Sequence, residues 1–159
     1  MRNRKVLVAA LALFLALAAL PAALAQATYT VSISISPEGA GSVTITYNGT
    51  TYTDVASLEV EANSTITLEA KATEGYRFDH WEIDGATYYD NPLNYTVTGN
   101  TTVTAVFVRV FTLNITKEGE GYVRVDGVDY FVFPIAIVYD ANVSVTLEAV
   151  PADGYEFAY

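Results

Sequence analysis

The chain has 159 residues and a formal net charge of −10 at pH 7, because it contains 18 acidic residues and only eight lysines and arginines. It contains no cysteine, which excludes disulfides, thiol catalysis, thiolate metal ligands and a lipoprotein anchor. A strongly acidic surface repels nucleic acid and anionic membranes, so neither is an expected partner.

The first 25 residues have the three-part layout of a secretory signal peptide. Residues 1–5 carry three positive charges, residues 6–20 are an unbroken apolar run, and residues 21–25 end in an A-x-A pattern. We expect cleavage after Ala25, which leaves five bases against 18 acids, a net charge of −13. The alternative is an uncleaved anchor, since about 20 apolar residues span a bilayer. No later run is long enough, so the mature chain has no expected membrane span and is secreted or displayed on the cell surface.

The mature sequence alternates between apolar and polar residues with a period of two. Tyr29, Val31, Ile33 and Ile35 point to one face of the first predicted strand and serine or threonine to the other. Nowhere after residue 25 does the spacing of an amphipathic helix occur, which predicts an all-β fold built from small antiparallel modules. The predicted hairpin turns are Asn48-Gly49, Asp84-Gly85 and Asp126-Gly127, pairs suited to type I′ geometry.

The chain also contains an internal repeat. Glu61–Ala70 matches Asp140–Ala149 at an offset of 79 residues, and Gly75–Phe78 matches Gly154–Phe157 at the same offset. This pattern predicts two tandem modules, one at residues 28–109 and a second, truncated one at residues 110–159. The second module shows no match to residues 81–109. We therefore expect either a piece of a longer repeat protein, which we favour, or a last unit that another chain completes.

The aromatic residues of the first module predict its core. Tyr76 and Phe78 share a face, but Trp81 lies three residues further on and breaks the period of two. A β-bulge at Asp79-His80 would return Trp81 to the inner face. The expected structural core therefore contains Tyr76, Phe78, Trp81 and Phe107.

Four sequence blocks carry a family resemblance. In chain order they are G-x-G-x-V, V-T-L-x-A with Thr65-Ile66 in place of its valine, Gly75–Trp81 with Gly85 after it, and Asn100–Phe107, and they resemble the divergent form of the internalin-type B-repeat. Only the first three blocks begin in the second copy, where the tryptophan is missing. The resemblance implies a small, mostly β module strung in tandem on prokaryotic secreted or surface proteins. It implies no catalytic residues.

The candidate chemistry is sparse. His80, the only histidine, is flanked by Asp79 and Glu82, which permits a general base or a metal ligand. We favour a polar strand residue beside the bulge, because one histidine makes a poor transition-metal site. The many carboxylates are expected on turns and outer strand positions, with adventitious Ca²⁺ binding as the alternative. Without a nucleophile–base pair, we expect no enzyme activity and no cofactor.

Two groups of surface residues remain. Tyr88 and Tyr89 are adjacent and cannot both face inward, so they are the expected exposed contact aromatics. Six of the seven mature asparagines begin an N-x-S/T sequon, which favours N-glycosylation, although Asn-x-Thr is also common where a turn enters a strand. These asparagines are Asn48, Asn63, Asn94, Asn100, Asn114 and Asn142.

The sequence thus predicts an exported, acidic, non-enzymatic β-repeat glycoprotein that acts as a spacer or adhesion module of the cell envelope. Its expected partners are neighbouring repeats or envelope proteins. One alternative is an adhesin module that itself binds carbohydrate or protein. Another is a fibre subunit that assembles by strand donation, with its incomplete last unit filled by a neighbour.

Overall fold

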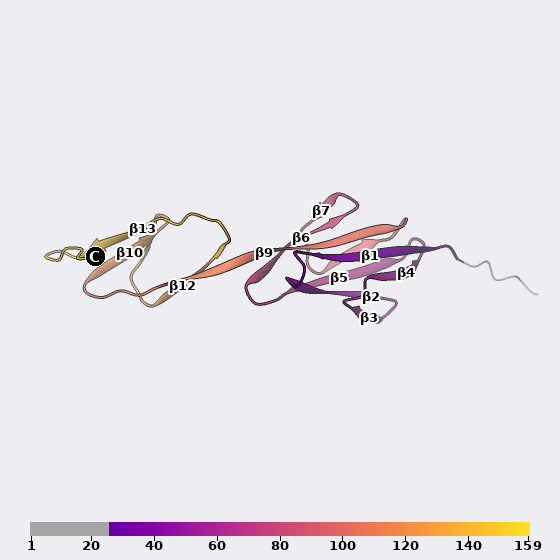
Figure 1. Cartoon of the computed structure of the whole chain (residues 1–159), viewed down its shortest axis with the longest axis horizontal. Helices are drawn as coiled ribbons and strands as arrows, with labels where there is room; N and C mark the ends of the chain where they lie inside the picture. Colours follow the sequence, from indigo (N-terminus) through magenta and orange to yellow (C-terminus); the bar gives the residue numbers. More distant parts are fainter. Residues whose placement is uncertain (1–25) are drawn as a thin grey trace, which may run out of the picture.

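The structure, a computed structural model, describes residues 26–159, and the expected signal peptide lies outside these residues. Thirteen strands and no helix are present in the described part of the chain, so the all-β prediction is confirmed. Figure 1 shows an elongated molecule in which the two groups of strands lie end to end and β9 runs through both. In chain order the strands are β1 (Thr28–Ser36), β2 (Gly41–Tyr47), β3 (Thr50–Thr53), β4 (Ser57–Glu61), β5 (Thr65–Ala72), β6 (Tyr76–Ile83), β7 (Ala86–Tyr88), β8 (Leu93–Thr96), β9 (Thr101–Ile115), β10 (Gly121–Val125), β11 (Val128–Tyr130), β12 (Ile135–Asp140) and β13 (Leu147–Pro151).

The first unit contains two sheets. One has the strand order β4-β1-β9-β6-β7 and the other β3-β2-β5-β8. All pairings are antiparallel except that of β1 with β9, which is parallel and joins Val31 to Thr101 at its start. A parallel pairing needs a long connection, and here the whole of β2 to β8 lies between the two strands.

The apolar faces of these two sheets form one hydrophobic core. Val31, Trp81 and Val103 of the first sheet and Ile66 and Leu68 of the second are all fully buried. The alternation seen in the sequence therefore places one face of each strand in this core. Phe107 is also buried, whereas Tyr76 and Phe78 are half-buried and pack against the core.

The three predicted hairpin turns have the backbone geometry of type I′ turns. Both central residues have positive φ in Asn48-Gly49 (48° and 76°), Asp84-Gly85 (49° and 82°) and Asp126-Gly127 (48° and 85°). Asparagine, aspartate and glycine tolerate this conformation best. The turns set the register of β2 with β3, β6 with β7, and β10 with β11.

The predicted bulge is present in β6. The register against β9 shifts between Phe78, which lies opposite Phe107, and His80, which lies opposite Val106. Because of the shift, Trp81 faces the core with no exposed surface, and its ring centroid lies 5.2 Å from that of Phe78. The indole Nε1 donates a hydrogen bond of 3.0 Å to the carbonyl oxygen of Asp90.

The second unit repeats part of this pairing. The C-terminal part of β9 pairs with β12, and β10 lies between β11 and β13 in a separate sheet. Val123 lies opposite Ala149, as Val43 lies opposite Ala70 in the first unit, and these pairs correspond in the internal repeat. The boundary expected between residues 109 and 110 falls inside β9.

Candidate functional site: the junction between the two units

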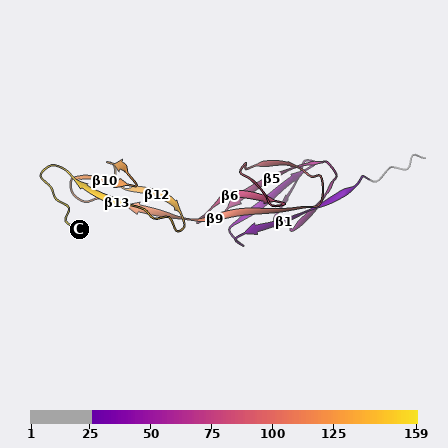
Figure 2. The ribbon, with the colours of Figure 1, turned by 90° about the horizontal axis from the view of Figure 1, so that it is seen from above.

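A single strand carries the connection between the two units. The first part of β9 pairs with β1 and β6, and Val110–Ile115 pairs with β12. Figure 2 shows β9 continuing from one group of strands into the other without an intervening loop. Fifteen residues of β-strand span about 50 Å at about 3.3 Å per residue. The junction is therefore a strand rather than a linker.

The elements of the two units meet β9 on opposite edges at this point. The Val110 amide donates to the carbonyl oxygen of Gly75, at the start of β6, while the carbonyl oxygen of Arg109 accepts from the Ala141 amide, at the end of β12. Consecutive residues of a strand direct their backbone groups to opposite edges. The two units are thus hydrogen-bonded to adjacent residues of β9, one unit at each edge of the strand.

A side-chain contact crosses β9 between these two edges. Arg77 of β6 lies opposite Val108, and Asp140 of β12 lies opposite Val110, so both side chains leave the same face of the sheet. Arg77 Nε donates to Asp140 Oδ1 at 2.7 Å, and Nη2 donates to Asp140 Oδ2 at 2.7 Å. This two-point geometry fixes orientation as well as distance.

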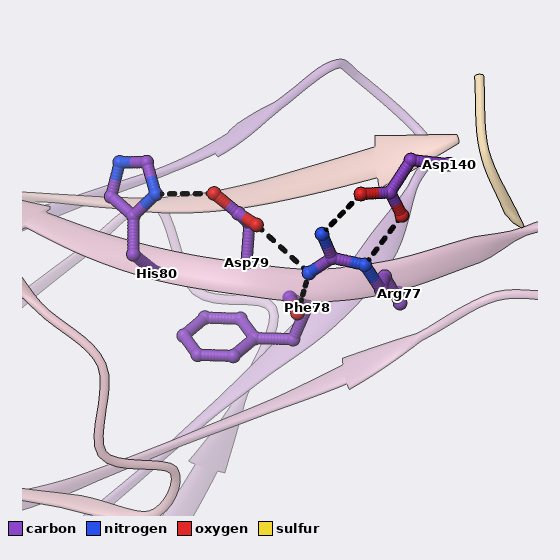
Figure 3. Close-up of polar contacts among 5 residues, drawn as sticks. All are labelled: Arg77, Phe78, Asp79, His80 and Asp140. Carbon is purple, nitrogen blue, oxygen red and sulfur yellow. Dashed lines mark hydrogen bonds and ion pairs between the residues drawn. The ribbon is translucent and has the colours of Figure 1, made fainter. Parts of the chain in front are cut away.

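The contact continues along the bulge of β6. Arg77 Nη1 donates to Asp79 Oδ1 at 2.8 Å, and Asp79 Oδ2 lies 2.8 Å from His80 Nδ1. Figure 3 shows the four side chains in one row, with Arg77 between the two carboxylates. The bulge places Asp79 beside Arg77, so the feature that buries Trp81 also orients the guanidinium. We call these four residues, Arg77, Asp79, His80 and Asp140, the junction cluster.

The charges of the junction cluster stabilise one another. The hydrogen bond from Arg77 lowers the pKa of Asp140, and the hydrogen bond with His80, followed by that from Arg77, lowers the pKa of Asp79. The Asp140 contact is also the largest cause that raises the pKa of Arg77. Since the Arg77 side chain is 45% exposed, water screens these interactions. The contribution of the cluster to the stability of the fold is therefore small.

The structure places His80 beside the bulge, with one ring nitrogen facing Asp79. Within residues 26–159, no group of three or more histidine, cysteine, aspartate or glutamate side chains converges in a way that could hold a metal ion. In the same part of the chain, no helix has the length and apolar character needed to cross a membrane. The ion pair between Arg77 and Asp140 joins residues of the two units.

The two adjacent tyrosines have different environments. Tyr89 is 75% exposed, and its ring lies 6.1 Å from that of His80. Tyr88 is half-buried and packs against the core, with its ring edge-on to that of Tyr95 at 6.0 Å. They therefore do not form a shared aromatic surface, and of the two only Tyr89 is widely exposed.

All six sequon asparagines are exposed. Asn48, Asn63 and Asn142 lie in turns with positive φ. Asn94 and Asn100 use their Oδ1 atoms as acceptors, from the Thr67 hydroxyl and the Thr30 amide. Asn114 lies on β9 within the second unit. Glycosylation of these residues stays a prediction.

The sequence did not point to Arg77 or Asp140. The available signal was a difference between the two copies, because Arg77 aligns with Glu156 in otherwise matching Gly-Tyr-x-Phe blocks. Residues 26–159 contain only five lysines and arginines, so a position that is basic in one copy and acidic in the other is unusual. That difference could have singled out Arg77 as a candidate contact residue. Nothing in the sequence identified its partner, which lies 63 residues away.

The fold and the junction define a tandem β-repeat protein. Residues 29–111, more than half of the chain, match the model of the divergent InlB B-repeat domain, so the chain belongs to this family. The expected resemblance is thereby confirmed. No curated protein matches the chain, and no solved structure does. Family membership indicates an extracellular or surface repeat module.

Proposed function

We propose that the protein is a non-enzymatic spacer of the cell envelope, in which consecutive B-repeat units hold a distal surface at a fixed distance. The observation that carries this proposal is the continuity of β9 across both units. Linkers rich in glycine or serine behave as flexible coils, whereas a paired strand transmits both position and direction. The junction cluster adds a side-chain restraint on the angle between the units.

The surface chemistry supports display in water. Residues 26–159 carry 18 acids and five bases, and a high net charge keeps proteins soluble and apart from one another. The six exposed sequons add sites at which glycans would extend the hydrated surface. We infer that the protein is exported and N-glycosylated. The intact mass of the secreted product, measured before and after chemical deglycosylation, tests this inference, and an unchanged mass would contradict the glycan part of it.

Small-angle X-ray scattering of the chain tests the spacer proposal. The expected result is an extended particle with two separated mass centres, as Figure 1 shows. A matched control inserts Gly-Ser-Gly-Ser between Arg109 and Val110, which interrupts β9 and is expected to give a broader distribution of dimensions. A compact particle for the unmodified chain would contradict the proposal.

A contact role is the second candidate, supported by the exposure of Tyr89. An aromatic ring that is 75% exposed beside His80 offers a face on which a sugar ring could stack. The test is binding to a panel of oligosaccharides by the chain and by Tyr89→Ala, with Tyr88→Phe as the control. Binding that Tyr89→Ala abolishes would favour an adhesin, and the absence of binding would favour a spacer.

A further inference from the structure

The four sequons of the first unit differ in how much of each one reaches the surface. A glycosyl-transferring enzyme reads a sequon as three residues, because it needs the hydroxyl of the third residue as well as the asparagine amide. All four asparagines are exposed. In the sequon that starts at Asn48, Gly49 and Thr50 are exposed as well. In the other three sequons the middle residue is half-buried or buried, and these residues are Ser64, Tyr95 and Thr101.

The sequon at Asn48 forms the turn between β2 and β3. Asn48 and Gly49 have positive φ, and a Cβ on Gly49 would meet no atom within 4 Å. Thr50 begins β3, a strand of four residues at the edge of its sheet that pairs with β2. Opening this end of the hairpin therefore breaks few contacts. An enzyme can approach the whole sequon from solvent.

The sequons at Asn63 and Asn94 are held by the pairing of β5 with β8. Their third residues, Thr65 of β5 and Thr96 of β8, lie opposite one another with their hydroxyl oxygens 3.3 Å apart. Asn94 Oδ1 also accepts a hydrogen bond of 2.7 Å from the Thr67 hydroxyl. Neither sequon can enter an enzyme's binding site until β8 separates from β5.

That separation would expose part of the core. The Asn63 amide donates to the carbonyl oxygen of Val97, and the Val97 amide donates to the carbonyl oxygen of Ser64, both at 2.9 Å. Val97 has no exposed surface, and Leu93 at the start of β8 is 7% exposed. Bringing buried aliphatic side chains into water is unfavourable, so the folded unit rarely presents these two sequons.

The sequon at Asn100 is anchored at all three of its residues. Asn100 Oδ1 accepts a hydrogen bond of 3.0 Å from the Thr30 amide. Thr101 is only 4% exposed, and the Thr102 amide donates to Asp84 Oδ1 at 2.8 Å. Freeing this sequon requires the start of β9 to leave β1.

We propose that Asn48 is the N-glycan acceptor of the folded first unit, and that Asn63, Asn94 and Asn100 accept a glycan only in a chain that has not folded. This inference rests on the N-glycosylation proposed above and names its site. The donor is a lipid-linked oligosaccharide. The step forms a bond between Asn48 Nδ2 and C1 of the first sugar, breaks the bond between C1 and the lipid phosphate, and releases that phosphate and one amide proton.

A glycan on Asn48 would lie at the end of the first unit away from the junction cluster. The neighbouring Tyr47 hydroxyl accepts a hydrogen bond from the Glu61 amide, and Glu61 lies opposite Thr28 at the start of β1. Because β1 and β9 are parallel, the start of β1 is remote from Arg109, where the second unit begins. The glycan therefore extends the hydrated surface without entering the junction.

The test measures glycan transfer to the folded protein. The unglycosylated chain of residues 26–159 is incubated with a purified oligosaccharyltransferase and a lipid-linked oligosaccharide, and peptide mapping gives the rate at each asparagine. Four synthetic peptides, each with one of these sequons and its flanking residues, supply the rate of each sequence without the fold. Relative to its peptide, Asn48 is expected to react at least about tenfold faster than Asn63, Asn94 or Asn100. Equal relative rates, or an unmodified Asn48 whose peptide reacts, would overturn the inference.

Three variants complete the test. Thr50→Ala removes the required hydroxyl and is expected to abolish transfer to Asn48, whereas Thr53→Ala, at another exposed position of β3, is expected to leave it unchanged. Trp81→Ala loosens the core and is expected to raise the rates at the other three asparagines. Rates that stay low in Trp81→Ala, although circular dichroism shows the first unit unfolded, would also overturn the inference. A secreted product without glycan would refute the proposed glycosylation, whereas equal relative rates would refute this inference alone.

Discussion

Arg77 and Asp140 form a two-point ion pair across β9, with both N–O distances at 2.7 Å, although 63 residues separate them in the chain. Each residue belongs to a different unit, and each lies on a strand that pairs with β9. The pair therefore couples the orientation of the second unit to the first through side chains, in addition to the shared backbone.

Replacing Arg77 by glutamine is expected to loosen the junction without unfolding either unit. The variant keeps a polar side chain of similar length but loses the charge and the fork geometry that match a carboxylate. The Ala141 amide, which bonds to the Arg109 carbonyl oxygen, is expected to exchange with solvent several times faster. Arg124→Gln is the matched control, because Arg124 pairs with Asp129 and Glu148 within the second unit. Equal exchange at Ala141 in all three proteins would contradict a coupling role for Arg77.

The junction cluster is expected to lose its effect in acid. The pKa values of Asp79 and Asp140 are lowered in the folded protein. Their contribution is therefore complete above the unfolded value of about 3.9 and is lost as the pH falls through the lower folded values. The difference in melting temperature between the chain and Arg77→Gln should be constant above about pH 5 and shrink as the pH falls below the unfolded value of about 3.9. A difference that persists at the acid end would contradict the assigned cause.

Trp81 is expected to be the largest single contributor to the first core. Its side chain has no exposed surface, so Trp81→Ala should lower the free energy of unfolding by about 3–5 kcal/mol. Trp81→Phe keeps most of the packing but leaves the Asp90 carbonyl oxygen without its donor, which should cost about 1–2 kcal/mol. Trp81 is the only tryptophan, so neither variant can be followed by tryptophan fluorescence. Urea unfolding is therefore followed by far-UV circular dichroism. An alanine effect below about 1 kcal/mol would contradict the packing described above.

Gly41 is expected to tolerate no side chain. A Cβ at this position would overlap the ring of Phe107 and lie 2.7 Å from the carbonyl oxygen of Lys71. Gly41→Ala should therefore destabilise the first unit by about 1–3 kcal/mol. Gly99→Ala is the control, because a Cβ there meets nothing within 4 Å. Equal melting temperatures for the two variants would show that Phe107 moves aside without cost.

Local sequence signals predicted the local features of the fold. Asn48-Gly49 and the two Asp-Gly pairs set type I′ turns because few residues accept positive φ at both positions. The three-residue step from Phe78 to Trp81 predicted the bulge because the core requires both rings on one side. Features that depend on distant partners were not predictable. The parallel pairing of β1 with β9 joins residues about 70 positions apart, and the Arg77–Asp140 contact has no local signature.

The passage of β9 through the expected boundary has a physical explanation. The alternation of apolar residues from Val103 to Phe107 continues from Phe111 to Ile115 with only Arg109 between them. No glycine, proline or asparagine interrupts the strand at that point. A repeat boundary marks where the pattern recurs, and it does not require the chain to leave a strand.

The most direct test of the spacer account is the distance distribution between spin labels in the two units. The chain contains no cysteine, so Thr51→Cys on β3 and Ala136→Cys on β12 place one label on an exposed strand position in each unit. Double electron–electron resonance is expected to give a single narrow distance for the unmodified junction and a broadened one for Arg77→Gln. A broad distribution in the unmodified junction would contradict the claim that β9 holds the two units in a fixed line.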